Sequence, residues 1–183
     1  MRASTRLIAS ACVGAIRLYD VNLREGGWDE RLVLELAELS SVIKLNEQEA
    51  LTIGSFVGVP VSDTEALCGG LASRLGLRGV AITAGGSGAS LLLDSIFARA
   101  RAPEVSVVDT IGSGDAFAAA LIDGIARGAS AAAVVRRANA LGGLIASRPG
   151  ATPLWTRTEL AALEAQIAVA CDPMTAIARC RLA

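Results

Sequence analysis

The stretch that decides the fold is Asp109-Thr-Ile-Gly-Ser-Gly-Asp-Ala-Phe117. It follows the apolar run Val105–Val108, a predicted strand, and opens a predicted helix that ends near Arg127. Gly112 and Gly114 allow a tight turn and close backbone approach. The unpaired N–H groups at the helix start attract anionic oxygens. Asp115 suits the removal of a proton from a hydroxyl group beside such an anion. For a bare Gly-x-Gly-Asp, however, we favour a strand-to-helix turn with a capping Asp.

Strands and helices alternate along the rest of the chain. Strands are predicted at 17–22, 41–45, 79–83, 89–93 and 105–108, and helices at 29–39, 47–53, 63–75, 115–127, 130–146 and 156–168. This alternation predicts a mainly parallel sheet covered by helices on both faces. Ligands bind such sheets at the carboxyl ends of the strands, where this sequence has its Gly, Asn, Asp and Glu clusters. The tail after Cys171 is only weakly patterned.

Composition excludes several classes of function. The 183 residues include 17 basic and 18 acidic residues, so nothing in the charge balance indicates a nucleic acid or an anionic membrane as partner. The absence of histidine removes His-based triads and His-containing zinc sites. A catalytic base must therefore be a carboxylate, lysine, tyrosine or thiol. The four cysteines form no CxxC pair, which is typical of a reducing compartment.

The N-terminus has two interpretations. Arg2 and Arg6 precede an apolar run that contains Cys12, a pattern similar to a signal peptide with a lipid-attachment cysteine. However, Ala9 stands where a large aliphatic residue is usual, and a predicted strand follows without a spacer. We favour a helix of a cytoplasmic protein, and we expect no segment that spans a membrane.

Three further polar clusters each have a simple structural explanation. Asn46-Glu-Gln-Glu49 fits a capping box, in which Asn46 and Glu49 satisfy backbone groups at a helix start. The glycines of Thr83–Gly88 suit a hairpin between two strands. Asp20 and Asn22 can bond within a local turn, which would leave Arg24 an exposed loop residue.

The nine-residue string 109–117 resembles the second signature of the PfkB (ribokinase-like) carbohydrate kinases, D-T-x-G-[AS]-G-D-x-F. The resemblance implies a three-layer α/β/α ribokinase-like core. It also implies that Asp115 is the base for a sugar hydroxyl, and that the backbone of Gly112, Ser113 and Gly114 is the anion hole for the transferred phosphoryl group.

Other segments match the same family in the same order. By this resemblance, Asn46 and Glu49 organise Mg²⁺ and phosphate. Asp20-x-Asn22-x-Arg24 followed by Trp28 is similar to fructokinase-like and 2-keto-3-deoxygluconate kinase-like members, and marks Arg24 as a substrate contact. The resemblance assigns nucleotide contacts to Thr83, Gly85, Gly86, Gly88, Asn139 and Gly150, and places Asp109, Ile111 and Gly150 near a monovalent cation such as K⁺ in some members.

The implied activity is ATP-dependent phosphoryl transfer to the hydroxyl of a small sugar or sugar acid, with Mg²⁺ as cofactor. Residues 1–155 would be the nucleotide-binding and catalytic C-terminal part of the kinase domain, and 156–183 a final helix and tail. Family members are longer at the N-terminus, where much of the sugar site and a β lid lie. We therefore expect weak or no activity from this chain. A homodimer is compatible with the family, although the usual lid interface is missing.

Three alternatives remain open at this point. The chain is a non-catalytic kinase fragment that binds nucleotide or pairs with another chain, a dinucleotide-binding protein, or a vitamin-precursor kinase of the same superfamily. Against the dinucleotide alternative, the turn ends in Gly114-Asp115 and does not follow G-x-G-x-x-G. The Asp20-x-Asn22-x-Arg24 element argues against the vitamin-precursor kinase.

Overall fold

A computed structural model describes residues 7, 14–24 and 26–173. The apolar run around Cys12 and the tail beyond residue 173 lie outside these described residues, so the two N-terminal interpretations stay as predictions. Within the described part of the chain, no helix combines the length and the apolar character that crossing a membrane requires.

Six strands form one sheet in sequence order: β1 (Leu18–Asp20), β2 (Val42–Asn46), β3 (Gly79–Thr83), β4 (Ala89–Leu93), β5 (Ile96–Ala100) and β6 (Val169–Pro173). β1, β2 and β3 are parallel neighbours, whereas the pairs β3–β4, β4–β5 and β5–β6 are antiparallel. β1, β2, β3 and β5 therefore run in one direction. The predicted α/β fold is confirmed, with an antiparallel extension on one side of the parallel strands.

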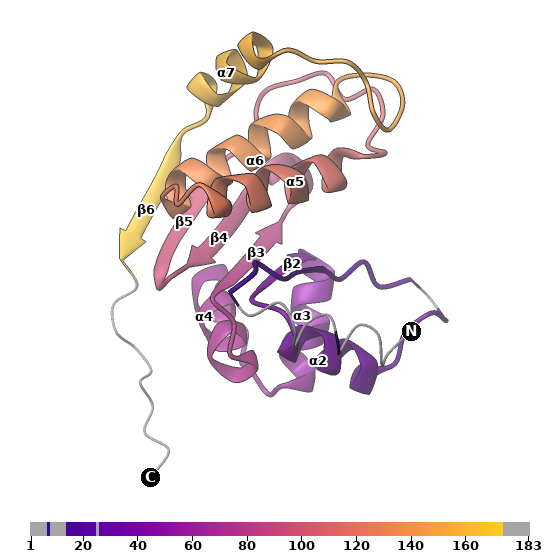
Figure 1. The fold of residues 1–183 in the computed structure, drawn as a ribbon, viewed down its shortest axis with the longest axis vertical. Helices are drawn as coiled ribbons and strands as arrows, with labels where there is room; N and C mark the ends of the chain where they lie inside the picture. Colours follow the sequence, from indigo (N-terminus) through magenta and orange to yellow (C-terminus); the bar gives the residue numbers. More distant parts are fainter. Residues whose placement is uncertain (1–6, 8–13, 25, 174–183) are drawn as a thin grey trace.

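Helices cover both faces of this sheet (Figure 1). α2 (Glu30–Glu38), α3 (Glu47–Phe56) and α4 (Thr64–Leu75) lie on one face, and α5 (Ser113–Ala126), α6 (Ala131–Ala146) and α7 (Arg157–Gln166) on the other. Each face has its own buried apolar core. Alternate residues of β2 supply both, because Val42 packs toward α5 and α6 while Ile43 and Leu45 pack toward α3 and α4. The predicted three-layer α/β/α arrangement is confirmed.

Local sequence signals explain where the helices begin and end. The side chains of Asp29, Asp63, Ser130 and Thr156 each accept a hydrogen bond from a backbone N–H in the first turn of the helix that follows. Gly76 ends α4 in the left-handed conformation.

The predicted strand at Val105–Val108 is wrong. Residues 101–107 follow β5 as irregular backbone, and Val107 and Val108 are exposed. The true strand at this place is β5, which a tight turn at Asp94 and Ser95 joins to β4; both turn residues have positive φ. Pro103 has no N–H to donate to a sheet, which is one reason the chain leaves the sheet after Ala100. β6 was also not predicted, and it occupies the edge that β5 would otherwise leave open.

Candidate active site

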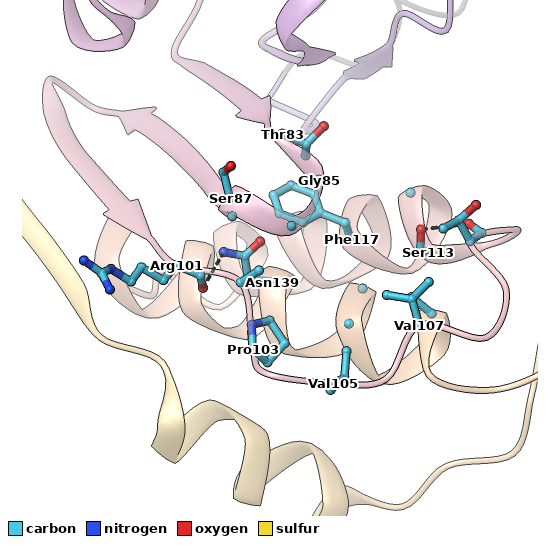
Figure 2. Close-up of a pocket in the computed structure, with 18 of the residues that line it drawn as sticks. Thr83, Gly85, Ser87, Arg101, Pro103, Val105, Val107, Ser113, Phe117 and Asn139 are labelled. Atoms are coloured by element: carbon cyan, nitrogen blue, oxygen red, sulfur yellow. Dashed lines mark hydrogen bonds between the residues drawn. The ribbon is translucent and has the colours of Figure 1, made fainter.

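A pocket of about 700 Å³ opens between the β3–β4 turn, the irregular segment 101–107 and the facing helices α5 and α6. Figure 2 shows its labelled residues converging from these elements, with Thr83 and Ser113 on its upper side and Pro103 and Val105 below. It brings together seven residues that the sequence marked: Thr83, Gly85, Gly86, Gly88, Ser113, Gly114 and Asn139.

The β3–β4 turn forms one wall of the pocket with its backbone. A short 3₁₀ turn, Gly85–Ser87, leaves Gly85 and Gly86 exposed. Gly88 has φ +107°, and a Cβ there would lie 2.1 Å from the carbonyl oxygen of Ala100. Glycine is therefore required at Gly88 for the turn to lie against the end of β5. The predicted hairpin at this place is confirmed.

The first turn of α5 forms the opposite wall. The N–H and hydroxyl of Ser113 both donate to the carbonyl oxygen of Thr110, at 3.2 and 2.8 Å. Helix geometry gives the N–H groups of Gly114 and Asp115 no intrahelical acceptor, and the N-cap residue Gly112 has no side chain to cap them. Asp115 is exposed, and its carboxylate has no hydrogen-bond partner within the described residues. Within the described residues, the N–H groups of Gly114 and Asp115 are thus free to donate to an anion, whereas the N–H of Ser113 donates to Thr110 in this structure.

Asp109 clamps the turn before α5 to the loop after α6. Its Oδ1 accepts from the N–H of Ile111 at 2.9 Å, and its Oδ2 accepts from the N–H of Gly150 at 3.1 Å. Gly112 completes the contact, because at φ +82° an added Cβ would lie 2.1 Å from the carbonyl oxygen of Ala151. The structure thus brings Asp109, Ile111, Gly112 and Gly150 together in one set of backbone contacts. These residues lie outside the pocket lining.

Asn139 holds the segment 101–107 in place from inside α6. Its Nδ2 donates to the carbonyl oxygens of Ala100 and Arg101, at 2.9 and 3.1 Å. Because only the amide nitrogen can donate to two carbonyl oxygens, the orientation of the side chain is determined. Figure 2 shows the oxygen of Asn139 directed away from this bond.

Asn46 and Glu49 form the predicted capping box at the start of α3, outside the pocket lining. The buried Glu49 carboxylate accepts from the N–H of Asn46 at 2.8 Å and from the N–H of Leu23 at 2.9 Å. The second bond ties α3 to the loop that carries the exposed Arg24. Burial, and then the charge of Glu49, raises the pKa of Tyr19 on β1. In the described ranges, no three Cys, Asp or Glu side chains gather as a metal site.

Sequence reasoning missed the lower wall of the pocket. Gly143 of α6 lies under Pro103, where an added Cβ would be 2.4 Å from Cγ of the proline. Gly142 faces Ser113, where an added Cβ would lie 3.3 Å from the carbonyl oxygen. The signal was present in the sequence, because two adjacent glycines inside a helix are unfavourable unless close packing requires them.

Known proteins share parts of this sequence and its fold. Residues 3–157 match the pfkB family carbohydrate kinases. A fructokinase from Vibrio alginolyticus is 27% identical over 161 residues, which are 80% of this chain and 50% of the relative.

Two solved structures extend the comparison. A nucleoside kinase from Burkholderia thailandensis in complex with inosine has a TM-score of 0.71 and 29% identity, over 87% of this chain and 50% of the other. A sugar kinase from Pyrococcus horikoshii in complex with ATP has a TM-score of 0.66 and 26% identity, over 82% and 48%. The chain spans about half the length of these relatives. With most of its length matched to one family, the chain belongs to the pfkB family of carbohydrate kinases.

Proposed function

We propose that this chain carries the ATP-binding and phosphoryl-transfer half of a sugar kinase, and that it acts in the cytoplasm. The observation that carries the proposal is the pocket itself. It runs from a glycine turn with exposed backbone to the uncapped first turn of α5. That turn carries Asp115, whose carboxylate has no hydrogen-bond partner among the described residues. A nucleotide needs such an apolar pocket with a few polar groups for its base and free N–H donors for its phosphates.

In this proposal the nucleotide lies along the pocket. The base and ribose lie between the Thr83–Gly88 turn and the segment that Asn139 holds. The phosphates extend toward α5, where the N–H groups of Gly114 and Asp115 and the helix dipole favour negative charge. The Asp109–Gly150 bond keeps the turn before α5 fixed against the loop after α6, so these donors are positioned before the ligand arrives.

The proposed chemistry is a direct displacement. The Asp115 carboxylate takes the proton of a sugar hydroxyl, the hydroxyl oxygen forms a bond to the γ-phosphorus, and the bond from that phosphorus to the β–γ bridging oxygen breaks. The electron pair of that bond leaves with ADP. Backbone donors at the start of α5 stabilise the negative charge on the phosphoryl oxygens. Arg24 is proposed to contact the sugar or its carboxylate, because its guanidinium is exposed and its loop is tied to α3 by Glu49.

Asn46 and Glu49 suit Mg²⁺ by their oxygen chemistry, with one restriction. The side-chain oxygen of Asn46 and both carboxylate oxygens of Glu49 each accept one backbone N–H already. Each of these oxygens keeps one further lone pair. These residues would therefore hold the ion through water, as Mg²⁺ often prefers. When bound, Mg²⁺ would neutralise phosphate charge. Asp109 and Ile111 remain proposed neighbours of a monovalent cation such as K⁺.

A phosphoryl-transfer assay tests the proposal. The chain is incubated with Mg²⁺, γ-labelled ATP and a panel of fructose, ribose, 2-keto-3-deoxygluconate and inosine, and labelled product is separated. We expect weak transfer at most, and Asp115→Asn should lower any transfer about 100-fold or more while ATP affinity stays within about twofold. Transfer that Asp115→Asn leaves unchanged, or a folded chain that does not bind ATP, would contradict the proposed function.

The second candidate function is that of a kinase fragment whose sheet is completed by pairing with another polypeptide. β1 is an edge strand of only three residues, and within the described residues it pairs with β2 alone. Such an edge offers unpaired backbone groups to a further strand. Sedimentation of the purified chain distinguishes the candidates: a concentration-dependent dimer, or a stable complex formed only with a co-expressed partner, would favour this second reading.

A further inference from the structure

A lysine that no sequence motif marked lies beside the start of α5. The sequence has 17 Lys and Arg residues, and Lys44 is the only lysine among them. It stands on β2 between Ile43 and Leu45, which pack into the opposite core, so its side chain emerges on the α5 face of the sheet. Only 12% of that side chain is exposed.

The ammonium group of Lys44 is held between β1 and α5. Both carboxylate oxygens of Asp20 on β1 accept from Nζ at 2.9 Å. On the other side, a Cβ added to Gly114 would lie 3.4 Å from the same Nζ. Glycine at this position leaves the ammonium in direct reach of the first turn of α5.

A structural role alone explains this placement poorly. The N-terminus of a helix carries a partial positive charge, and α5 has no side-chain cap, so a cation beside it is repelled. A largely buried ammonium also loses hydration, which Asp20 offsets only in part. Lys44 carries three N–H donors, and in the described part of the chain its acceptors are the two oxygens of Asp20. An anion at this point would offset the positive charge of Lys44 and of the helix start.

We propose that Lys44 is a further contact of the transferred phosphoryl group and that Asp20 is a positioning residue that holds Nζ toward α5. The inference rests on the proposed function, because the anion is the γ-phosphate of the bound ATP. Lys44 keeps its proton throughout the transfer, and its N–H donates to a phosphoryl oxygen while Asp115 takes the proton of the sugar hydroxyl. A compact ammonium reaches the first turn of α5 beside Gly114, and the wider, planar guanidinium of arginine does not reproduce its geometry.

Because the chain has a single lysine, one NMR signal reports on this contact. The chain is labelled with ¹³C at lysine Cε and ¹⁵N at Nζ, and titrated with ATP, ADP and adenosine while calorimetry records binding of each. We expect the Lys44 signal to shift with ATP, to shift less with ADP, and to stay in place with adenosine. If ATP binds but the Lys44 signal does not move, the inference is overturned while the proposed function stands. A folded chain that does not bind ATP overturns both.

Variants separate the contact from its positioning. Lys44→Met should weaken ATP binding at least tenfold and leave adenosine binding unchanged, and Lys44→Arg should restore only part of the loss. Asp20→Ala should lower the preference for ATP over ADP as Lys44→Met does, with no further loss in the double variant. If Asp20→Ala instead tightens ATP binding, its carboxylate merely repels the nucleotide, and the positioning role is rejected.

A matched control removes a cation elsewhere in the chain. Arg78 pairs with Asp94 at the opposite end of β3, and both side chains are about half exposed. Arg78→Met should change ATP affinity less than twofold. An equal loss in Arg78→Met and Lys44→Met would mean that net charge, not contact, explains the effect. Urea unfolding of each variant confirms that the chain compared is folded.

Discussion

Replacing Gly112 with alanine tests whether the turn before α5 and the loop after α6 form one unit. At φ +82° an alanine is strained by about 1 kcal/mol or more. Its Cβ would also lie 2.1 Å from the carbonyl oxygen of Ala151, whereas ordinary C···O contacts begin near roughly 3.3 Å. The loop must therefore move away by about 1 Å, which strains or breaks the bond from Gly150 to Asp109.

The expected magnitude follows from these parts. Backbone strain contributes about 1 kcal/mol, steric overlap about 1–2 kcal/mol, and the lost hydrogen bond about 1 kcal/mol, so Gly112→Ala should lower the free energy of unfolding by about 3–4 kcal/mol. The matched control is Gly128→Ala, where φ is +69° but no atom lies within 4 Å of an added Cβ. That variant should lose about 1 kcal/mol, from backbone strain alone.

Urea unfolding followed by circular dichroism measures both variants, and calorimetry measures their ATP affinity. We expect Gly112→Ala to bind ATP at least tenfold more weakly, because the Gly114 and Asp115 donors move with the turn, whereas Gly128→Ala should bind as the parent chain does. Equal destabilisation of the two variants, together with unchanged ATP affinity in Gly112→Ala, would refute the reasoning.

Three further predictions concern the clamp, the core and the one buried cysteine described. Asp109→Asn replaces one acceptor with a donor facing a backbone N–H, and should cost about 1–3 kcal/mol by urea unfolding; no change would show that the Asp109 clamp is not needed. Leu121→Ala in the fully buried core beneath α5 should cost about 2–5 kcal/mol, against less than about 1 kcal/mol for the neighbouring, partly exposed Ile122→Ala, and equal losses would contradict the packing described. Burial raises the pKa of the Cys68 thiol from 9.0 to about 12, so the unfolded chain releases this proton first and stability should fall by about 1.4 kcal/mol per pH unit above pH 9, toward pH 12. Cys68→Val should remove that part of the pH dependence in urea unfolding, and an identical profile in the variant would count against it.

Much of the fold was predictable because local signals agreed with tertiary packing. The caps at Asp29, Asp63 and Thr156 and the left-handed Gly76 begin or end helices where the pattern predicted. β3 and β4 match their predicted bounds, because each is a short apolar run beside a glycine turn.

The errors arose where tertiary structure decides between similar patterns. Val105–Val108 reads as a strand, but Pro103 and the close contact with Gly143 carry this segment along the pocket instead. β6 has no strong pattern of its own and exists because the edge of β5 accepts it. Lys44 could not be identified from the sequence, since its importance rests on a contact with Gly114 that only the fold creates.

The candidate site was predictable in part for the same reason. The glycines of both turns mark close backbone approaches, so the sequence indicated Gly88 and Gly112 correctly as turn positions. The sequence could not show that the N–H of Ser113 donates to Thr110, or that the amide of Asn139 donates to the carbonyl oxygen of Ala100 at the end of β5. The roles of these residues toward a nucleotide stay as predictions.

The central claim is that ATP binds in this pocket with its phosphates at the start of α5. Backbone amide NMR of the ¹⁵N-labelled chain, titrated with ATP and with adenosine, tests it most directly. We expect saturable shifts at Gly85, Gly86 and Gly88 with both ligands, and shifts at Gly114 and Asp115 with ATP only. A folded chain whose amides at Gly114 and Asp115 do not respond to ATP, or respond equally to adenosine, would contradict it.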